Sequence, residues 1–190
     1  MERRRFVLGT IALFPLAVFG KVKMLIAKRT DKPFKVGSGE ARFGVHYEMK
    51  GVTRNTLDIK ISGKDTDGEL AVFEQTGHTP NGGPPLHIHT DQDEWFFVTE
   101  GEYLFQCGEE RFQVKAGDTI FLPRNVPHAF VQITEKARTI VSYMPAGRME
   151  DFFATTDKWT APPSSEEIAK VFSDHGMQVV GGPLQVDQAK

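Results

Sequence analysis

The chain has 190 residues, which is enough for one domain with a substantial core but too few for two barrels plus termini. Its 23 basic and 25 acidic side chains give a formal net charge of −2, and no run of Lys or Arg follows the first few residues, which argues against nucleic acid as a partner. Cys107 is the single cysteine, so no disulfide can form within the chain.

Residues 1–27 have the features of a targeting segment. Arginines at positions 3–5 precede an apolar run over residues 6–20, as in an export signal, and this run is shorter than the roughly 20 residues that a membrane-spanning helix needs. The arginines and the residues after them also resemble the twin-arginine export consensus. We expect a signal peptide or, if the run extends to Ala27, an N-terminal anchor. The protein would then be exported, periplasmic or membrane-anchored, with membrane contact only through this segment; a cytoplasmic protein with an apolar N-terminal helix is the alternative.

Residues 28–40 are predicted to be a linker, and residues 41–147 a β-barrel. Alternation of apolar and polar side chains over residues 57–61 is typical of a half-buried antiparallel strand. Short strands separated by turns, without an internal repeat, indicate an all-β fold with a single jelly-roll barrel. The further strands are predicted at residues 70–75, 95–99, 103–107, 111–114, 119–122, 128–133 and 138–143.

Metal-ligand side chains occur in two clusters within the barrel. His87 and His89 are two residues apart, so on a strand they point to the same face. Glu94 begins the next strand-like run, and His128 begins another. If these runs are strands of one small barrel, three imidazoles and a carboxylate converge, which is a suitable ligand set for one divalent transition metal ion.

The same alternation predicts the wall of a substrate pocket. Phe96 and Val98 share the face of Glu94, whereas Phe130 and Gln132 share the face of His128. Apolar walls with a few convergent polar groups are typical of small-molecule sites. A barrel that binds a ligand without metal is the alternative.

Residues 148–190 form an extension after the barrel. Ser164 and Glu167 offer a capping box directly after two prolines, which predicts a short C-terminal helix at about residues 164–175. Its apolar stripe must pack on the barrel or on a second subunit, and we expect a homodimer.

The two clusters resemble the signature motifs of the cupin superfamily. The first motif, G-x5-H-x-H-x3–4-E-x6-G, matches from His87 to Gly101, with Asn81 at the first glycine position. The second, G-x5-P-x-G-x2-H-x3-N, matches from Gly117, with Asn125 at the turn glycine and Gln132 at the final asparagine. The resemblance implies a double-stranded β-helix barrel with His87, His89, Glu94 and His128 as metal ligands.

Residues 50–185 also resemble single-domain bacterial quercetinases, the flavonol dioxygenases. The segments that carry this resemblance are GELAVFEQT, GGPPLHIHTDQDEWFFVTEG and the tail that begins MPAGRMEDFF. It implies an oxygenase that uses Fe, Mn, Co or Ni with dioxygen and a small-molecule substrate. Glu94 would be both a ligand and the acceptor of the substrate hydroxyl proton. A non-oxidative isomerase or lyase, and a binding protein without turnover, are the alternatives.

Overall fold

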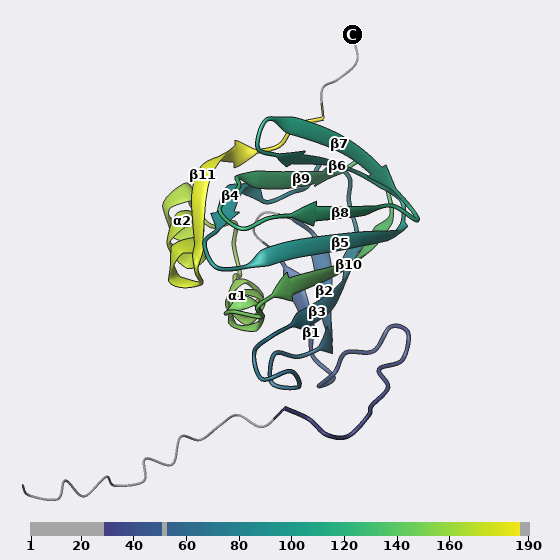
Figure 1. The fold of residues 1–190 in the computed structure, drawn as a ribbon. Helices are drawn as coiled ribbons and strands as arrows, with labels where there is room; N and C mark the ends of the chain where they lie inside the picture. Colours follow the sequence, from purple (N-terminus) through teal and green to yellow (C-terminus); the bar gives the residue numbers. More distant parts are fainter. Residues whose placement is uncertain (1–28, 51–52, 187–190) are drawn as a thin grey trace, which may run out of the picture.

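The computed structural model describes residues 29–50 and 53–186 (Figure 1). The predicted signal or anchor at residues 1–27 lies outside the described residues. Among the residues that are described, no helix is long and apolar enough to cross a membrane.

Two antiparallel sheets face each other across the core (Figure 1). This arrangement confirms the predicted all-β jelly roll. The six-stranded sheet contains, in spatial order, β1 (His46–Met49), β2 (Asn55–Ile61), β3 (Ala71–Gly77), β10 (Ala137–Met144), β5 (Asp93–Glu100) and β8 (Thr119–Leu122). The five-stranded sheet contains β11 (Met177–Pro183), β4 (Pro85–His89), β9 (His128–Gln132), β6 (Glu102–Cys107) and β7 (Glu110–Lys115).

The inward positions of the strands form the core. On β3, buried Ala71, Phe73 and Gln75 alternate with half-buried residues, as the period of two in a strand requires. Away from the histidines, the barrel is filled by rings that contact edge to face or at a tilt, with centroids 5.0 to 6.1 Å apart, a favourable range for aromatic pairs. These rings belong to Phe96, Tyr103, Phe105 and Phe130.

The C-terminal extension covers one end of the barrel with two helices, α1 (Met149–Thr156) and α2 (Ser165–Asp174) (Figure 1). The helix predicted near residues 164–175 is confirmed as α2, and its capping box forms between Ser164 and Glu167. Phe172 is the buried residue of α2, and its ring lies 5.0 Å from that of Phe152 on α1. The stripe of α2 therefore packs on this chain's own barrel and helix.

Neither α1 nor β11 was predicted from the sequence. α1 begins at Met149 with no side-chain cap, so the usual start signal is missing. β11 includes Gly181, Gly182 and Pro183, residue types that favour turns, and it forms because it pairs with β4. Only the assembled sheet provides that pairing.

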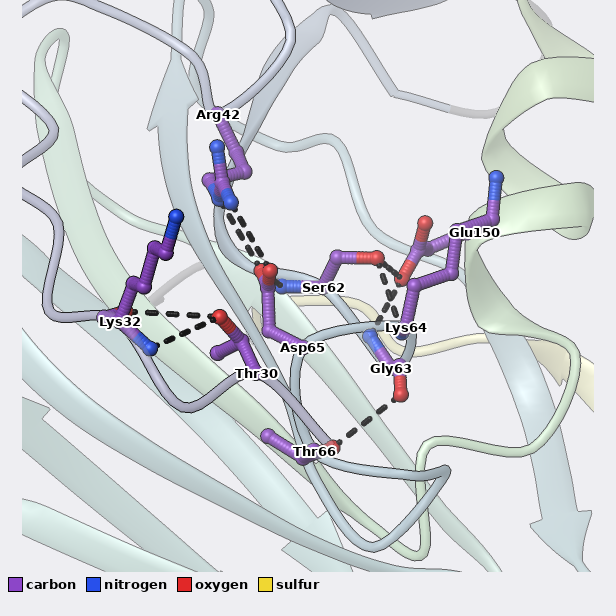
Figure 2. Close-up of polar contacts among 9 residues, drawn as sticks. All are labelled: Thr30, Lys32, Arg42, Ser62, Gly63, Lys64, Asp65, Thr66 and Glu150. Carbon is purple, nitrogen blue, oxygen red and sulfur yellow. Dashed lines mark hydrogen bonds and ion pairs between the residues drawn. The ribbon is translucent and has the colours of Figure 1, made fainter. Parts of the chain in front are cut away.

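A polar network joins the N-terminal segment, the loop after β2 and the start of α1 (Figure 2). The guanidinium of Arg42 donates two hydrogen bonds to the carboxylate of Asp65, at 3.1 and 2.9 Å. Glu150 Oε1 accepts hydrogen bonds from the Ser62 hydroxyl at 2.8 Å and the Gly63 amide at 2.7 Å. Because Glu150 lies in the first turn of α1, this network holds the helix that carries Phe152 against the barrel.

Candidate metal centre

The structure brings the four predicted ligand side chains to one point inside the barrel. His87 and His89 are buried neighbours on β4, His128 lies opposite His87 on β9, and Glu94 comes from β5 in the other sheet. One potential ligand atom from each side chain lies within 4.8 Å of the others. The group can therefore hold a single metal ion.

Backbone carbonyls orient two of the imidazoles. His87 Nδ1 donates to the Pro85 carbonyl at 2.8 Å, and His128 Nδ1 donates to the Val126 carbonyl at 2.9 Å. Because a carbonyl can only accept, each ring carries its proton on Nδ1, and in the neutral ring Nε2 keeps a lone pair facing the cluster. This is the usual arrangement of metal-binding histidines.

A glutamine orients the third imidazole. Gln92 Oε1 accepts from His89 Nδ1 at 3.1 Å, while Gln92 Nε2 donates to the carbonyls of Pro145 and Ala146, both at 2.9 Å. The two carbonyls fix the orientation of the amide, and the amide fixes the ring of His89. No role for Gln92 could be predicted from the sequence, because its partners follow β10, more than 50 residues away in the chain.

The electrostatics of the cluster suit a cation. Burial opposes the charge on Glu94, but its contact with His128 and the potential of the other imidazoles lower the pKa of Glu94 to about 2. Burial lowers the pKa of His87 to about 3, and His128 and His89 contribute to this shift. At neutral pH a carboxylate therefore lies beside a neutral His87.

One buried atom in the cluster has no hydrogen bond to the described residues. This atom is His128 Nε2, and Glu94 Oε2 lies 3.1 Å away. Because the Nδ1 hydrogen of His128 is donated to Val126, its Nε2 lone pair can point at the Glu94 carboxylate. A cation bound by both groups would satisfy both. Three imidazole nitrogens and one carboxylate suit Fe, Mn, Co or Ni, and the donor set does not select among them.

Tyr143 is a neighbour of the cluster that the sequence analysis did not identify. It lies directly opposite Glu94 in the register between β10 and β5. Burial raises the pKa of Tyr143 well above its ordinary value, and the Glu94 carboxylate raises it further, so the hydroxyl keeps its proton. The hydroxyl can therefore donate a hydrogen bond to Glu94.

A narrow apolar cavity adjoins the cluster. It has a volume of about 60 Å³, and His87, His89 and Glu94 form one part of its wall. Most of the remaining wall is contributed by the two helices and by strands of the six-stranded sheet. The aromatic residues that line it are Phe130, Tyr143, Phe152, Phe153, Trp159 and Phe172.

Comparison with known proteins identifies a domain family within the barrel. The family model for the cupin domain matches residues 78–143, which contain all four clustered side chains. Residues 78–143 of this chain are therefore a cupin domain. Two structures share the cupin fold: an RmlC-like cupin from Shewanella frigidimarina (TM-score 0.50, 21% identity, covering 66% of this chain and 99% of that one) and the polyketide cyclase RemF from Streptomyces resistomycificus (TM-score 0.50, 22% identity, covering 60% and 80%).

Two curated relatives extend the comparison. Quercetin 2,3-dioxygenase from Bacillus subtilis is 29% identical over 142 residues, which are 72% of this chain and 40% of that protein. An uncharacterized protein from Methanocaldococcus jannaschii is 40% identical over 48 residues, which are 25% of this chain and 38% of that protein. The chain thus spans about two fifths of the length of each.

Two asparagines stand at glycine positions of the cupin motifs. Asn81 and Asn125 have φ angles of 63° and 62°, in the left-handed region. Asparagine tolerates this region better than other non-glycine residues, so both turns keep the backbone that the motif glycines provide. Gly101, by contrast, has a φ of 76°, and a Cβ there would lie 2.4 Å from the Lys136 carbonyl oxygen.

Of the four predicted pocket residues, the structure places Phe130 on the wall of the apolar cavity beside the cluster. Phe96 and Val98 lie farther along β5 in the core, where Phe96 packs against Phe105 with ring centroids 5.0 Å apart. Gln132 is also buried away from the cavity, and its amide donates to the Thr134 carbonyl at 2.7 Å. Alternation along a strand gives the face of a side chain, but it does not give the depth at which the cavity ends.

Proposed function

We propose that this cupin is a metal-dependent dioxygenase for an aromatic or enolic small molecule, with a flavonol as the first candidate substrate. One observation carries the proposal: three oriented imidazoles and the ionised Glu94 converge on one point, and three of these side chains, His87, His89 and Glu94, form one part of the wall of an apolar cavity. Its similarity to quercetin 2,3-dioxygenase over 72% of the chain supports the choice of substrate.

The four side chains would hold a divalent Fe, Mn, Co or Ni ion. Such an ion would act as a Lewis acid toward a substrate hydroxyl and would provide redox chemistry with dioxygen.

Glu94 would receive the proton of the substrate hydroxyl. Its low pKa means that the carboxylate is ionised before substrate arrives. A base with a low pKa accepts a proton only from an acidic donor, so Glu94 would act on a hydroxyl whose pKa a bound metal ion would have lowered. Tyr143, which stays protonated, would donate to one carboxylate oxygen and orient the other toward the substrate.

The aromatic wall would bind the flat face of the substrate and exclude water. Ligand sites commonly have volumes of about 300–1,000 Å³, whereas this cavity has about 60 Å³. A multi-ring substrate therefore requires the wall to open, and the candidates are the side chains carried by α1 and α2. Phe172 lies against His87, with ring centroids 5.2 Å apart, so its displacement would open the cavity next to the candidate ligands.

Oxygen consumption tests the proposal directly. Protein of known metal content is mixed with quercetin in an oxygen electrode while the flavonol absorbance is followed. We expect one O2 consumed per flavonol, with both oxygen atoms retained in the products. Turnover without oxygen would indicate an isomerase or lyase, and binding without turnover would indicate a binding protein. If protein loaded in turn with Fe, Mn, Co and Ni consumes no oxygen with any flavonol, the proposal is wrong.

A further inference from the structure

The cavity has a second polar region, away from the histidines. Gln75 on β3 and Asn55 on β2 line the same cavity as Glu94, and they are only 5% and 7% exposed. Leu57, two positions after Asn55 on β2 and directly opposite Gln75 of β3, makes the adjoining wall apolar. Two amides therefore meet a cavity that is otherwise largely hydrophobic.

Gln75 has a buried donor without a partner. Its Nε2 makes no hydrogen bond of normal geometry to any residue that the structure describes, although Gln75 is near enough to the buried Tyr103 hydroxyl to oppose the rise in the pKa of that group. Thr139 lies directly opposite Gln75 on β10, and its hydroxyl is also buried without a partner. A buried polar group left unpaired destabilises the protein, so a ligand group that reached this amide would gain affinity from pairing with it. Gln75 lines the cavity and Thr139 does not, so Gln75 is the group that a ligand would meet.

The strand register places this amide far from Glu94. Tyr143 of β10 is opposite Glu94 on one side and Ala71 of β3 on the other, so these three residues share a row across the sheet. Gln75 lies four positions beyond Ala71 on β3, which is about 13 Å along the strand. This spacing is on the scale of a molecule with two or three rings.

We infer that Gln75 is a specificity-determining residue that hydrogen-bonds a hydroxyl or carbonyl group at the end of the substrate remote from the metal-binding side chains. Asn55 offers a second amide at the same end. The substrate class is then a polyhydroxylated aromatic molecule with a chelating end, an apolar middle and a polar far end. The inference rests on the proposed function only in one respect, namely that one end of the substrate chelates the metal.

A pair of flavonols tests this assignment. Quercetin carries hydroxyl groups on its outer rings, and 3-hydroxyflavone keeps the chelating end but lacks them. We would measure the dissociation constants of both for the metal-loaded protein under nitrogen, where no oxygenation can occur, by quenching of tryptophan fluorescence. The wild type should prefer quercetin, because 3-hydroxyflavone would leave the Gln75 amide unpaired.

Gln75→Leu should change the two affinities differently. Quercetin should bind about 10-fold more weakly, the scale of one hydrogen bond, while 3-hydroxyflavone should bind as tightly as before or more tightly. Thr76→Val, at the next and outward-facing position of β3, is the matched control and should leave both affinities unchanged. Gln75→Asn keeps an amide but shortens its reach; should the leucine variant not fold, the asparagine variant should still weaken quercetin selectively.

Each outcome is decisive. The role of Gln75 is overturned if a variant with native circular dichroism shows the same change in affinity for both flavonols. It is also overturned if the preference for quercetin survives both Gln75→Leu and Gln75→Asn. If the wild type binds both flavonols without discriminating between them, the assignment fails and the proposed function stands. If the wild type binds neither, the proposed function fails and the flavonol class assigned to this subsite fails with it.

Discussion

His87 on β4 and His128 on β9 are cross-strand partners, and their ring centroids are 4.6 Å apart. They belong to two different motifs, which the five-stranded sheet brings together. A shift of one residue in this register would turn one of the rings to the opposite face. The geometry of the metal centre is therefore coupled to the pairing of β4 with β9.

Removal of this histidine pair should abolish metal binding. We expect His87→Ala/His128→Ala to bind metal more than about 100-fold more weakly, since loss of an outer hydrogen-bond partner alone costs about 10- to 100-fold. Metal content by mass spectrometry and folding by circular dichroism give the measurement. His46→Ala/His78→Ala, which changes two histidines outside the cluster, is the control and should keep its metal. Full occupancy in the first double variant would refute the ligand assignment.

Replacement of Glu94 separates a ligand from a proton acceptor. Gln can offer an oxygen to the metal but cannot accept the substrate proton. Metal-reconstituted Glu94→Gln should therefore bind a flavonol and turn it over at least about 100-fold more slowly, as is typical when a general base is lost. Single-turnover absorbance measurements give the rate, and titration under nitrogen gives the affinity. A near-normal rate would restrict Glu94 to a structural role.

Loss of the Gln92 side-chain amide should loosen His89. In Gln92→Leu, His89 Nδ1 loses its acceptor and the carbonyls of Pro145 and Ala146 lose their donor. We expect metal affinity to fall by about 10- to 100-fold, measured by competition with a chelator. Asp91→Asn, at the exposed neighbouring position, should leave the affinity unchanged. Equal affinities for the two variants would show that Gln92 does not position His89.

Glu150 should stabilise the attachment of α1. Glu150→Ala removes the acceptor of the Ser62 hydroxyl and the Gly63 amide, and hydrogen bonds to a charged group contribute about 1.5–3 kcal/mol each when buried. Because Glu150 is only partly buried, we expect a loss of about 1–3 kcal/mol in the free energy of unfolding, measured with urea. Asp151→Asn, on the exposed side of the same turn, should change this free energy by less than about 0.5 kcal/mol. A comparable loss in both variants would assign the effect to helix charge instead.

Asp65 should make stability depend on pH on the acid side. Burial opposes its charge, but the hydrogen bonds from Arg42 and from the Ser62 amide outweigh this effect and hold the pKa of Asp65 below its ordinary value of 3.8. A carboxyl whose pKa is lower in the folded state stabilises the protein above pH 4 and loses that contribution as the pH falls through the folded pKa.

The comparison with Asp65→Asn isolates this contribution. The variant should be less stable than the wild type at pH 7, and the difference should shrink toward pH 3, because the carboxyl of the unfolded wild type, at its ordinary pKa of 3.8, binds a proton there. Thermal unfolding at both pH values gives the measurement, and acid effects common to both proteins cancel. A difference that stays constant between pH 7 and pH 3 would contradict the lowered pKa.

Local signals in the sequence were enough for most of the barrel strands and for α2, whereas the convergence of the four clustered side chains was predicted only on the condition that their strands belong to one barrel. Alternation along a strand is a local property, so His87 and His89 could be assigned to one face without knowledge of the rest of the chain. The capping box at Ser164 is also local, since both of its hydrogen bonds join residues three apart.

Only the tertiary structure decided which side chains contact the metal-binding residues and how far the cavity extends into the barrel. Gln92 reaches carbonyls that follow β10, and Tyr143 meets Glu94 only because β10 pairs with β5. Phe96 and Val98 have the predicted face but lie in the core, because the cavity ends where aromatic side chains from both sheets meet. Periodicity determines the direction of a side chain from its own backbone, whereas its contacts depend on strands and helices that arrive from distant parts of the chain.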